Sequence, residues 1–284
     1  MSEPKSAKPE SGSAPTLQNL REEIDRIDAS MHSLLIERGE IIGELIKVKR
    51  TTETGAAFRP AREASMMRRI VERHRGILPL DTVESIWRVI IATFTYVQAP
   101  YAVHADFSAG DAAVRDSARF HFGFTVPLSA HLGAAGVVAA VAQSKGDLGL
   151  VPASTLAGAG AWWTALEAEK GPKIIARLPF VERADHPASL PLFVVSRPIA
   201  ADSAVIEVEN WSIRVAGWSA GAARAATALA EIIAVPHGEF DGAALLASIP
   251  PGRTLDELTT ALVAAGASVR STALVGGHAT RYTV

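Results

Sequence analysis

One long amphipathic segment near the N-terminus constrains the fold of this chain more than any other feature. A helix over residues 17–50 would be about 50 Å long, longer than the short segments after it could cover. We therefore expect a second copy of the chain to pack against it. Apolar side chains recur there at steps of three and four with one gap, a spacing typical of a helix with coiled-coil character, at Leu17, Leu20, Ile24, Ile27, Met31, Leu34, Ile41, Leu45 and Val48.

Two shorter helices are predicted after this segment. Pro60 marks the first turn of one helix. Asp81 and Glu84 resemble a capping box that opens another, which ends near Gln98. Three helices, one of them overlong, predict an all-α domain over residues 16–100 that forms an intertwined homodimer.

After residue 100 the sequence changes to short apolar runs that alternate with Ala-rich stretches, which is typical of an α/β fold. We predict a multidomain chain, with an α/β domain over residues 101–202 and a small α+β domain over residues 203–284. The predicted strands are Tyr101–His104, Gly149–Pro152, Lys173–Leu178, Leu192–Ser196, Val205–Glu209, Ser212–Ala216, Ser268–Val275 and Thr280–Val284, and the predicted helices are Asp111–Phe120, Leu132–Gln143, Ala161–Glu169, Ala220–Glu231 and one opened by a capping box of Thr254 and Glu257.

Composition narrows the function classes. The 284 residues carry a formal net charge of -2 and contain no cysteine. No basic field favours nucleic acid or a membrane surface, and disulfides and cysteine metal sites are excluded. No apolar run approaches the ~20 residues of a membrane span. Residues 1–15 lack the apolar core of a signal peptide, so we expect a mobile tail and a cytoplasmic protein.

Arg38 occupies the gap in the apolar series, where a desolvated guanidinium without an anionic partner costs several kcal/mol. Lys49 follows eleven residues later, about 20° away around the helix and ~16 Å along it. Two cations on one face repel each other, which favours a small dianion bound between them. The structural alternatives are an ion pair of Arg38 with Glu63 or Glu37, or a side chain that extends to solvent at the dimer edge.

Arg21 lies seventeen residues before Arg38. That separation is about 25 Å along the helix and roughly 100° around it, so Arg21 cannot reach the same ligand from the same subunit. In an antiparallel dimer it would enter the partner's pocket and give two composite sites. Simple surface exposure is the alternative, since most arginines are exposed.

Five spaced motifs carry a family resemblance, namely Leu20–Asp28, Leu34–Arg38, Lys47–Lys49, Arg59–Glu63 and Val89–Gln98. As a set, over residues 17–98, they resemble the all-helical chorismate mutases. The resemblance implies that the chain rearranges chorismate to prephenate in aromatic amino acid biosynthesis. This pericyclic reaction needs no nucleophile and no net proton transfer, only a held conformer and donors for the developing charge. We therefore expect neither a cofactor nor a metal.

The resemblance also implies roles for individual residues. Arg38, and Arg21 across the dimer, would bind the two substrate carboxylates. Lys49 would contact a carboxylate and the ether oxygen. Gln98 would donate to the same ether oxygen.

Three further residues of the resemblance belong to the second helix. Glu63 would hold the ring hydroxyl, and Arg62 would support the carboxylates. Arg59 stands where the family often has an acidic residue that helps to bind the hydroxyl. Phe94, in the third helix, stands where a small hydroxyl residue is common, so both departures bear on affinity.

Some mutases of this family are fused to a prephenate dehydratase domain and a regulatory ACT domain. Gly146–Pro152 resembles a strand of that dehydratase, and the order of elements after residue 204 resembles an ACT module. However, Ala153–Thr155 and Leu190–Leu192 replace the expected Glu-Asn-Ser and Thr-Arg-Phe. Dehydration needs a general acid, so we expect a degenerate domain without dehydratase activity that binds an aromatic amino acid or prephenate.

Two other functions remain open. An isochorismate pyruvate lyase would use a related helical pocket on a similar dianion. A catalytically inert chain would be a metabolite-sensing protein. Two smaller expectations concern the second half: His237 and His278 should lie in loops without a metal-ligand pair, and Trp162–Trp163 should be a buried anchor.

Overall fold

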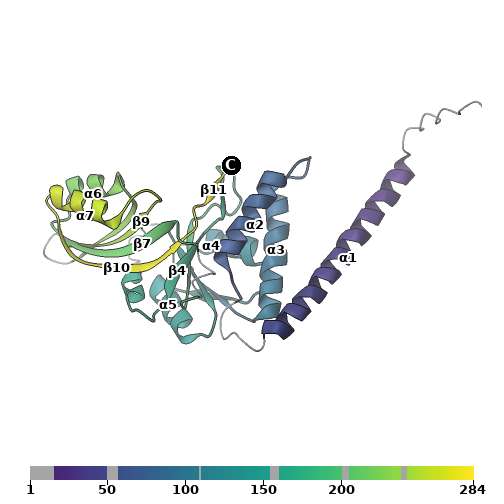
Figure 1. Ribbon diagram of the computed structural model, residues 1–284, viewed down its shortest axis with the longest axis horizontal. Coiled ribbons are helices and arrows are strands. Elements are labelled where there is room, and N and C mark those ends of the chain that lie inside the picture. The colour runs from purple at the N-terminus through teal and green to yellow at the C-terminus, as the bar shows by residue number, and fades with distance from the viewer. Residues whose placement is uncertain (1–15, 50–56, 109, 154–159, 200–204, 238–241) are drawn as a thin grey trace, which may run out of the picture. The chain divides into compact units, whose positions relative to one another are not determined.

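The computed structural model divides the chain into two compact units, residues 1–52 and residues 53–284. The first unit contains helix α1 (Leu17–Lys49), and the second contains all the other elements described (Figure 1). The structure describes residues 16–49, 57–108, 110–153, 160–199, 205–237 and 242–284. The tail expected over residues 1–15 lies outside these ranges.

Helix α1 confirms the predicted long helix within one residue of its expected end. Its apolar series is largely unburied in the single chain. Leu17 is 67% exposed, Met31 53% and Val48 71%. No described helix, α1 included, is long and apolar enough to cross a membrane.

The two shorter helices are α2 (Pro60–Arg73) and α3 (Leu80–Gln98). Pro60 is the first residue of α2, as predicted, because its fixed φ suits that position. The predicted capping box of Asp81 and Glu84 is wrong, since α3 begins before Asp81 and has no side-chain cap. Glu84 is instead fully buried in the second turn of the helix.

A nine-stranded mixed sheet forms the centre of the second unit and confirms the predicted α/β region. Its order is β2-β1-β3-β6-β4-β10-β7-β9-β8, and a separate pair joins β5 to β11. β1 lies parallel to β2 and β3, and β4 lies parallel to β10. The strands are β1 (Val103–Asp106), β2 (Leu128–His131), β3 (Leu148–Pro152), β4 (Lys173–Leu178), β5 (Val181–Glu182), β6 (Leu192–Ser196), β7 (Val208–Ala216), β8 (Glu231–His237), β9 (Gly242–Ile249), β10 (Ser268–His278) and β11 (Tyr282–Thr283).

Helices cover the parallel part of the sheet on two sides. α4 (Asp111–Phe122) shares a core with α2, α3 and the inward side chains of β1. α5 (Ala134–Gln143) shares a second core with the 3-10 helix η1 (Trp162–Leu166) and β6. The predicted helix over residues 161–169 is thus only this short turn. The prediction that Trp162–Trp163 is a buried anchor is confirmed.

Helices α2 and α3 are part of the same hydrophobic core as the sheet. Met67 of α2 and Ile91 of α3 belong to one buried cluster with Leu150 of β3 and Leu178 of β4. All four side chains are at most 5% exposed. The domain limits expected at residues 100 and 202 stay predictions.

The last part of the sheet is a β-α-β-β-α-β module with its own core. β7 is followed by α6 (Ala220–Thr227), β8, β9, α7 (Leu255–Ala264) and β10. The predicted capping box at α7 is confirmed, because the Thr254 side chain accepts from Glu257 N and the Glu257 side chain accepts from Thr254 N.

Several strand predictions in this module were wrong. The two strands expected over residues 205–216 are the single strand β7, and the helix expected to reach Glu231 ends at Thr227. β8 and β9 were missed, because neither sequence alternates strictly between apolar and polar residues, and β9 is rich in Ala and Leu. Pairing with neighbouring strands decides such segments more than their intrinsic propensity does, as β9 pairs with β7 on one side and with β8 on the other.

One glycine joins the module to the rest of the sheet. Gly276 of β10 pairs with Ile174 of β4, and its φ is +126°. A Cβ at Gly276 would lie 2.1 Å from the Ile174 carbonyl oxygen and 2.6 Å from its nitrogen. Only a residue without a side chain permits this approach of two backbones.

We expect Gly276→Ala to lower the free energy of unfolding by several kcal/mol, because the clashing atoms are backbone and cannot rotate away. Gly252→Ala is the matched control, since its φ is also positive, +82°, but nothing lies within 4 Å. That change should cost only about 1–2 kcal/mol of backbone strain. Urea unfolding of both variants measures the difference, and equal costs would contradict the close-approach argument.

Candidate functional site

Three of the predicted ligand-binding cations lie on α1. Arg21 is exposed and Arg38 is partly buried. Lys49 is the last residue of the helix, but its side chain lies outside the described residues. The continuous helix places Lys49 eleven residues after Arg38, hence ~16 Å along the axis and close to the same face.

The other four predicted residues lie in the second unit. Arg59 is the N-cap residue of α2, and Arg62 is exposed in its first turn. Glu63, next to Arg62, is 4% exposed. Gln98 ends α3, partly buried, and its Nε2 donates to the Phe94 carbonyl at 3.0 Å. It remains a prediction that these four residues and the cations of α1 line one pocket.

A buried ion pair holds Glu63. Arg88 of α3 donates from Nη1 to Glu63 Oε2 at 2.7 Å and from Nη2 to the His121 carbonyl at 3.1 Å. The Arg88 side chain is fully buried, and its guanidinium lies 5.0 Å from the centre of the Phe180 ring. Burial raises the pKa of Glu63, and the charge of Arg88 opposes that rise. Arg88 thus orients the carboxylate that the resemblance implies for substrate binding.

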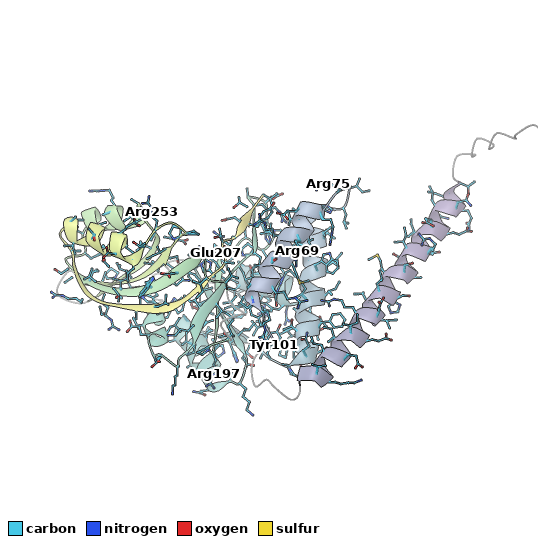
Figure 2. The ribbon with its side chains drawn as sticks, in the orientation of Figure 1. Arg69, Arg75, Tyr101, Arg197, Glu207 and Arg253 are labelled. Atoms are coloured by element: carbon cyan, nitrogen blue, oxygen red, sulfur yellow. The ribbon has the colours of Figure 1, made fainter. Side chains whose placement is uncertain are left out.

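Tyr101 adds a polar group beside this pair. It follows α3 (Figure 2) and is 5% exposed. Burial raises the pKa of Tyr101, and the negative charge of Glu63 raises it further. The phenol therefore stays protonated beside the ion pair at any ordinary pH.

A second buried carboxylate ties α3 to the segment between β5 and β6. Glu84 accepts from Arg183 Nη1 at 2.9 Å and is bonded to His186 Nε2 at 3.1 Å. The Ala188 amide donates to His186 Nδ1 at 2.9 Å. Because Nδ1 accepts, Nε2 must carry the proton and donate to Glu84. Both oxygens of this fully buried carboxylate are therefore satisfied.

His121 lies between the two carboxylates. It is fully buried, and its ring stacks on His186 with centroids 6.3 Å apart. Burial lowers the pKa of His121 well below its usual value, and the nearby Arg88 charge acts in the same direction. The ring is therefore neutral at physiological pH and adds no charge to the network.

Sequence reasoning missed this network. The buried face of α3 includes the polar residues Glu84, Arg88 and Thr95 beside Ile91 and Ala92. These positions also follow steps of three and four, so the periodicity was readable. Charged residues are rarely buried unless they are paired, so the sequence alone gives no reason to place Glu84 and Arg88 in a core.

Comparison with known proteins identifies the N-terminal region. Residues 20–99 match the family model for chorismate mutase type II. Residues 20–99 are therefore similar to a chorismate mutase type II domain and are called the mutase domain below. The bifunctional chorismate mutase/prephenate dehydratase of Neisseria gonorrhoeae is 36% identical over 86 residues, 29% of this chain. The match spans only 22% of that relative's length.

Two solved structures resemble the chain more distantly. A protein described as GqqA, a novel type of quorum quenching acylase, is 14% identical with a TM-score of 0.40, covering 63% of this chain and 95% of its own. Prephenate dehydratase from Streptococcus mutans is 12% identical with a TM-score of 0.38, covering 65% and 100%. Scores this low carry no argument about the region after the mutase domain.

Outside the mutase domain, two histidines lie close together, and the expectation that His237 and His278 lie in loops was wrong. His104 Nδ1 lies 2.9 Å from His131 Nε2, and His104 Nε2 lies 3.1 Å from Asp147 Oδ2. Parallel pairing of β1 and β2 brings the two rings together. His237 and His278 are the last residues of β8 and β10, not loop residues. Among the described residues, no group of three His, Asp or Glu side chains is placed to hold a metal.

We expect Arg88→Met in the mutase domain to lower the free energy of unfolding by about 3–5 kcal/mol, because the buried Glu63 carboxylate loses its partner. The double variant Glu63→Leu/Arg88→Met should recover most of the loss, since no buried charge remains. Arg69→Met, on the exposed side of α2, is the control and should stay within about 0.5 kcal/mol of wild type. Urea unfolding measures all three, and an undiminished cost in the double variant would refute the pairing argument.

Proposed function

We propose that the mutase domain converts chorismate to prephenate, as a step of aromatic amino acid biosynthesis in the cytoplasm. The observation that carries this proposal is the family match over residues 20–99. The continuous helix α1 supports it, because Arg38 and Lys49 share one face. Two cations on one face repel each other, and a substrate with two negative charges bound between them would offset this repulsion.

The proposed chemistry is electrostatic and conformational. Arg38, with Arg21 of a second copy, holds the two carboxylates and keeps the substrate folded. Lys49 and Gln98 donate to the ether oxygen, where negative charge grows in the transition state. Gln98 has a second amide hydrogen left for this role, because Nε2 gives one bond to Phe94.

The second helix supplies the remaining contacts in this proposal. Glu63 holds the ring hydroxyl with the oxygen that Arg88 leaves unused, since the ion pair engages Oε2. Arg62 supports a carboxylate from its exposed position beside Glu63. Arg59, at the helix N-cap, supplies a cation where the family often has an acid, which should favour an anionic substrate.

A homodimer is part of the proposal. The apolar series of α1 is too exposed for a stable single chain, and burying it against a second α1 removes that surface from water. A twofold dimer brings the same surface of both copies together. Each active site then contains Arg21 from one copy and Lys49 from the other.

We infer that the α/β region does not dehydrate prephenate. The two segments where catalytic residues would stand meet in the fold, because Ala153 N donates to the Pro191 carbonyl at 2.8 Å. The described side chains there are Ala153, Leu190 and Pro191, and Ser154 and Thr155 lie outside the described residues. None of those three side chains can act as a general acid.

Lys49→Ala should lower kcat/KM for chorismate by about 10²–10³, the usual effect of losing one preorganised donor. Lys47→Ala is the matched control on the same helix, because Lys47 is 71% exposed and pairs with Glu44 at 2.6 Å. The assay follows chorismate disappearance with separate detection of prephenate and pyruvate. Near-normal turnover in Lys49→Ala would remove the proposed role, and pyruvate release would indicate the lyase reaction instead.

Mixing Arg21→Ala and Lys49→Ala subunits should restore activity to about a quarter of wild type. Half of the exchanged dimers are mixed, and each of these has one intact composite site. Subunit exchange is verified by native mass spectrometry with one isotopically labelled partner. Demonstrated exchange without recovery of activity would contradict a site shared between subunits.

A further inference from the structure

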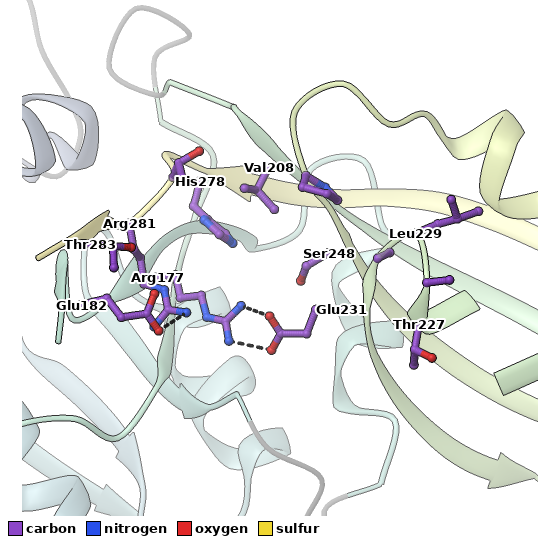
Figure 3. A pocket seen from close by; sticks show the side chains of 14 residues that line it. Arg177, Glu182, Val208, Thr227, Leu229, Glu231, Ser248, His278, Arg281 and Thr283 are labelled. Atoms are coloured by element: carbon purple, nitrogen blue, oxygen red, sulfur yellow. Dashed lines mark hydrogen bonds and ion pairs between the residues drawn. The ribbon is translucent and has the colours of Figure 1, made fainter. Parts of the chain in front are cut away.

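A cavity of about 540 Å³ lies where β4 and β5 meet the β-α-β-β-α-β module (Figure 3). Its lining includes two arginine–glutamate pairs, a histidine, Ser248 and several threonines. Its apolar lining includes Val208, Leu229 and Pro250. A volume of this order suits a small organic ligand.

The two ion pairs leave the cavity without formal net charge. Arg177 of β4 binds Glu231 of β8 through both terminal nitrogens, and Arg281 Nη2 lies 2.9 Å from Glu182 Oε1. Arg177 is only 7% exposed, and the Arg281 side chain is 18% exposed. A guanidinium has five N–H donors, so Arg281 keeps donors for a further acceptor after pairing with Glu182.

His278 presents an unused hydrogen-bond acceptor to the cavity. It is 3% exposed, and Figure 3 shows its ring pointing inward, toward the Arg177–Glu231 pair. Its Nδ1 lies 2.9 Å from the Ala279 carbonyl, which can only accept. Nδ1 therefore carries the proton and Nε2 the lone pair, and Nε2 has no partner among the described residues.

The electrostatic surroundings decide which donor suits His278. The pKa of His278 is lowered to about 4, mainly by burial and also by the charges of Arg177 and Arg281, while the hydrogen bond to the Ala279 carbonyl and the charge of Glu231 oppose this shift. The ring is therefore neutral and lies in a positive local potential. That potential disfavours an ammonium donor and leaves a neutral hydroxyl as the better partner.

We propose that this cavity binds a small hydroxycarboxylic acid. Its hydroxyl donates to His278 Nε2, its carboxylate lies against Arg281, and its alkyl part contacts the apolar wall formed by Val208, Leu229 and Pro250. The proposal goes beyond the mutase reaction, and its residues all belong to the second unit. A ligand that lacks the hydroxyl leaves a buried acceptor unsatisfied, which weakens binding.

Three matched probes test this with the full-length protein by isothermal titration calorimetry. They are 2-hydroxy-4-methylpentanoate, leucine and 4-methylpentanoate, which share one skeleton and differ in hydroxyl, ammonium or hydrogen at one carbon. We expect the hydroxy acid to bind with a Kd at least tenfold lower than the other two. Absence of binding, or equal binding of the acid without a hydroxyl, overturns the proposal, and tighter binding of leucine overturns the electrostatic argument for a neutral donor.

Variants then locate the site. His278→Phe and Arg281→Met should each weaken binding of the hydroxy acid at least tenfold. Arg197→Met, which changes an exposed arginine on a different part of the surface (Figure 2), should leave binding unchanged. Equal affinity in wild type and Arg281→Met would place the ligand elsewhere.

A measurement on the wild-type protein does not depend on the folding of any variant. The ¹⁵N resonance of His278 Nε2 should shift when the hydroxy acid is added, because a hydrogen bond to the lone pair changes its shielding. The acid without a hydroxyl should leave that resonance in place. An unmoved resonance at saturating hydroxy acid overturns the assignment of His278 as the acceptor.

Discussion

The buried pair of Glu63 and Arg88 is the interaction on which the arrangement of the second unit depends. It joins α2 to α3, and the second bond of Arg88 reaches α4 through the His121 carbonyl. Desolvated charges of this kind are tolerated only with good geometry and further hydrogen bonds. Replacement of either partner alone leaves a charge in the core, so the pair specifies how the mutase helices meet the α/β region.

Helices α2 and α3 therefore belong both to the mutase domain and to the core that they share with the sheet. Both helices lie within the stretch that matches the chorismate mutase model, and Met67 and Ile91 also complete the core of the neighbouring sheet. Glu63 is the residue that connects the two, because Oε2 binds Arg88 in the core and the other carboxylate oxygen is the one assigned to the substrate in the proposed mutase reaction. The apolar series of α1 is exposed in the single chain, and this exposure is the observation behind the proposed homodimer.

The C-terminal segment links the module to the mutase helices. Thr280 and Arg281 line the 540 Å³ cavity on one side and also border a hollow beside Ala61 and Ala64 of α2. Gly276, a few residues earlier, is the point where β10 meets β4. The stretch from Gly276 to Arg281 thus joins β10 to β4 and lines both the cavity and the hollow beside α2.

The sequence by itself determined the elements with strong local signals. Periodicity gives the length of α1, and cap chemistry gives Pro60 at the start of α2 and the Thr254 capping box. Short apolar runs give strands β4 and β6. Only the tertiary structure decided that Glu84 and Arg88 face inward and that β8 and β9 are strands. It also decided that His278 lines a cavity together with two arginine–glutamate pairs. The physical reason is that burial, strand pairing and ion pairing depend on residues distant in sequence, which no local pattern contains.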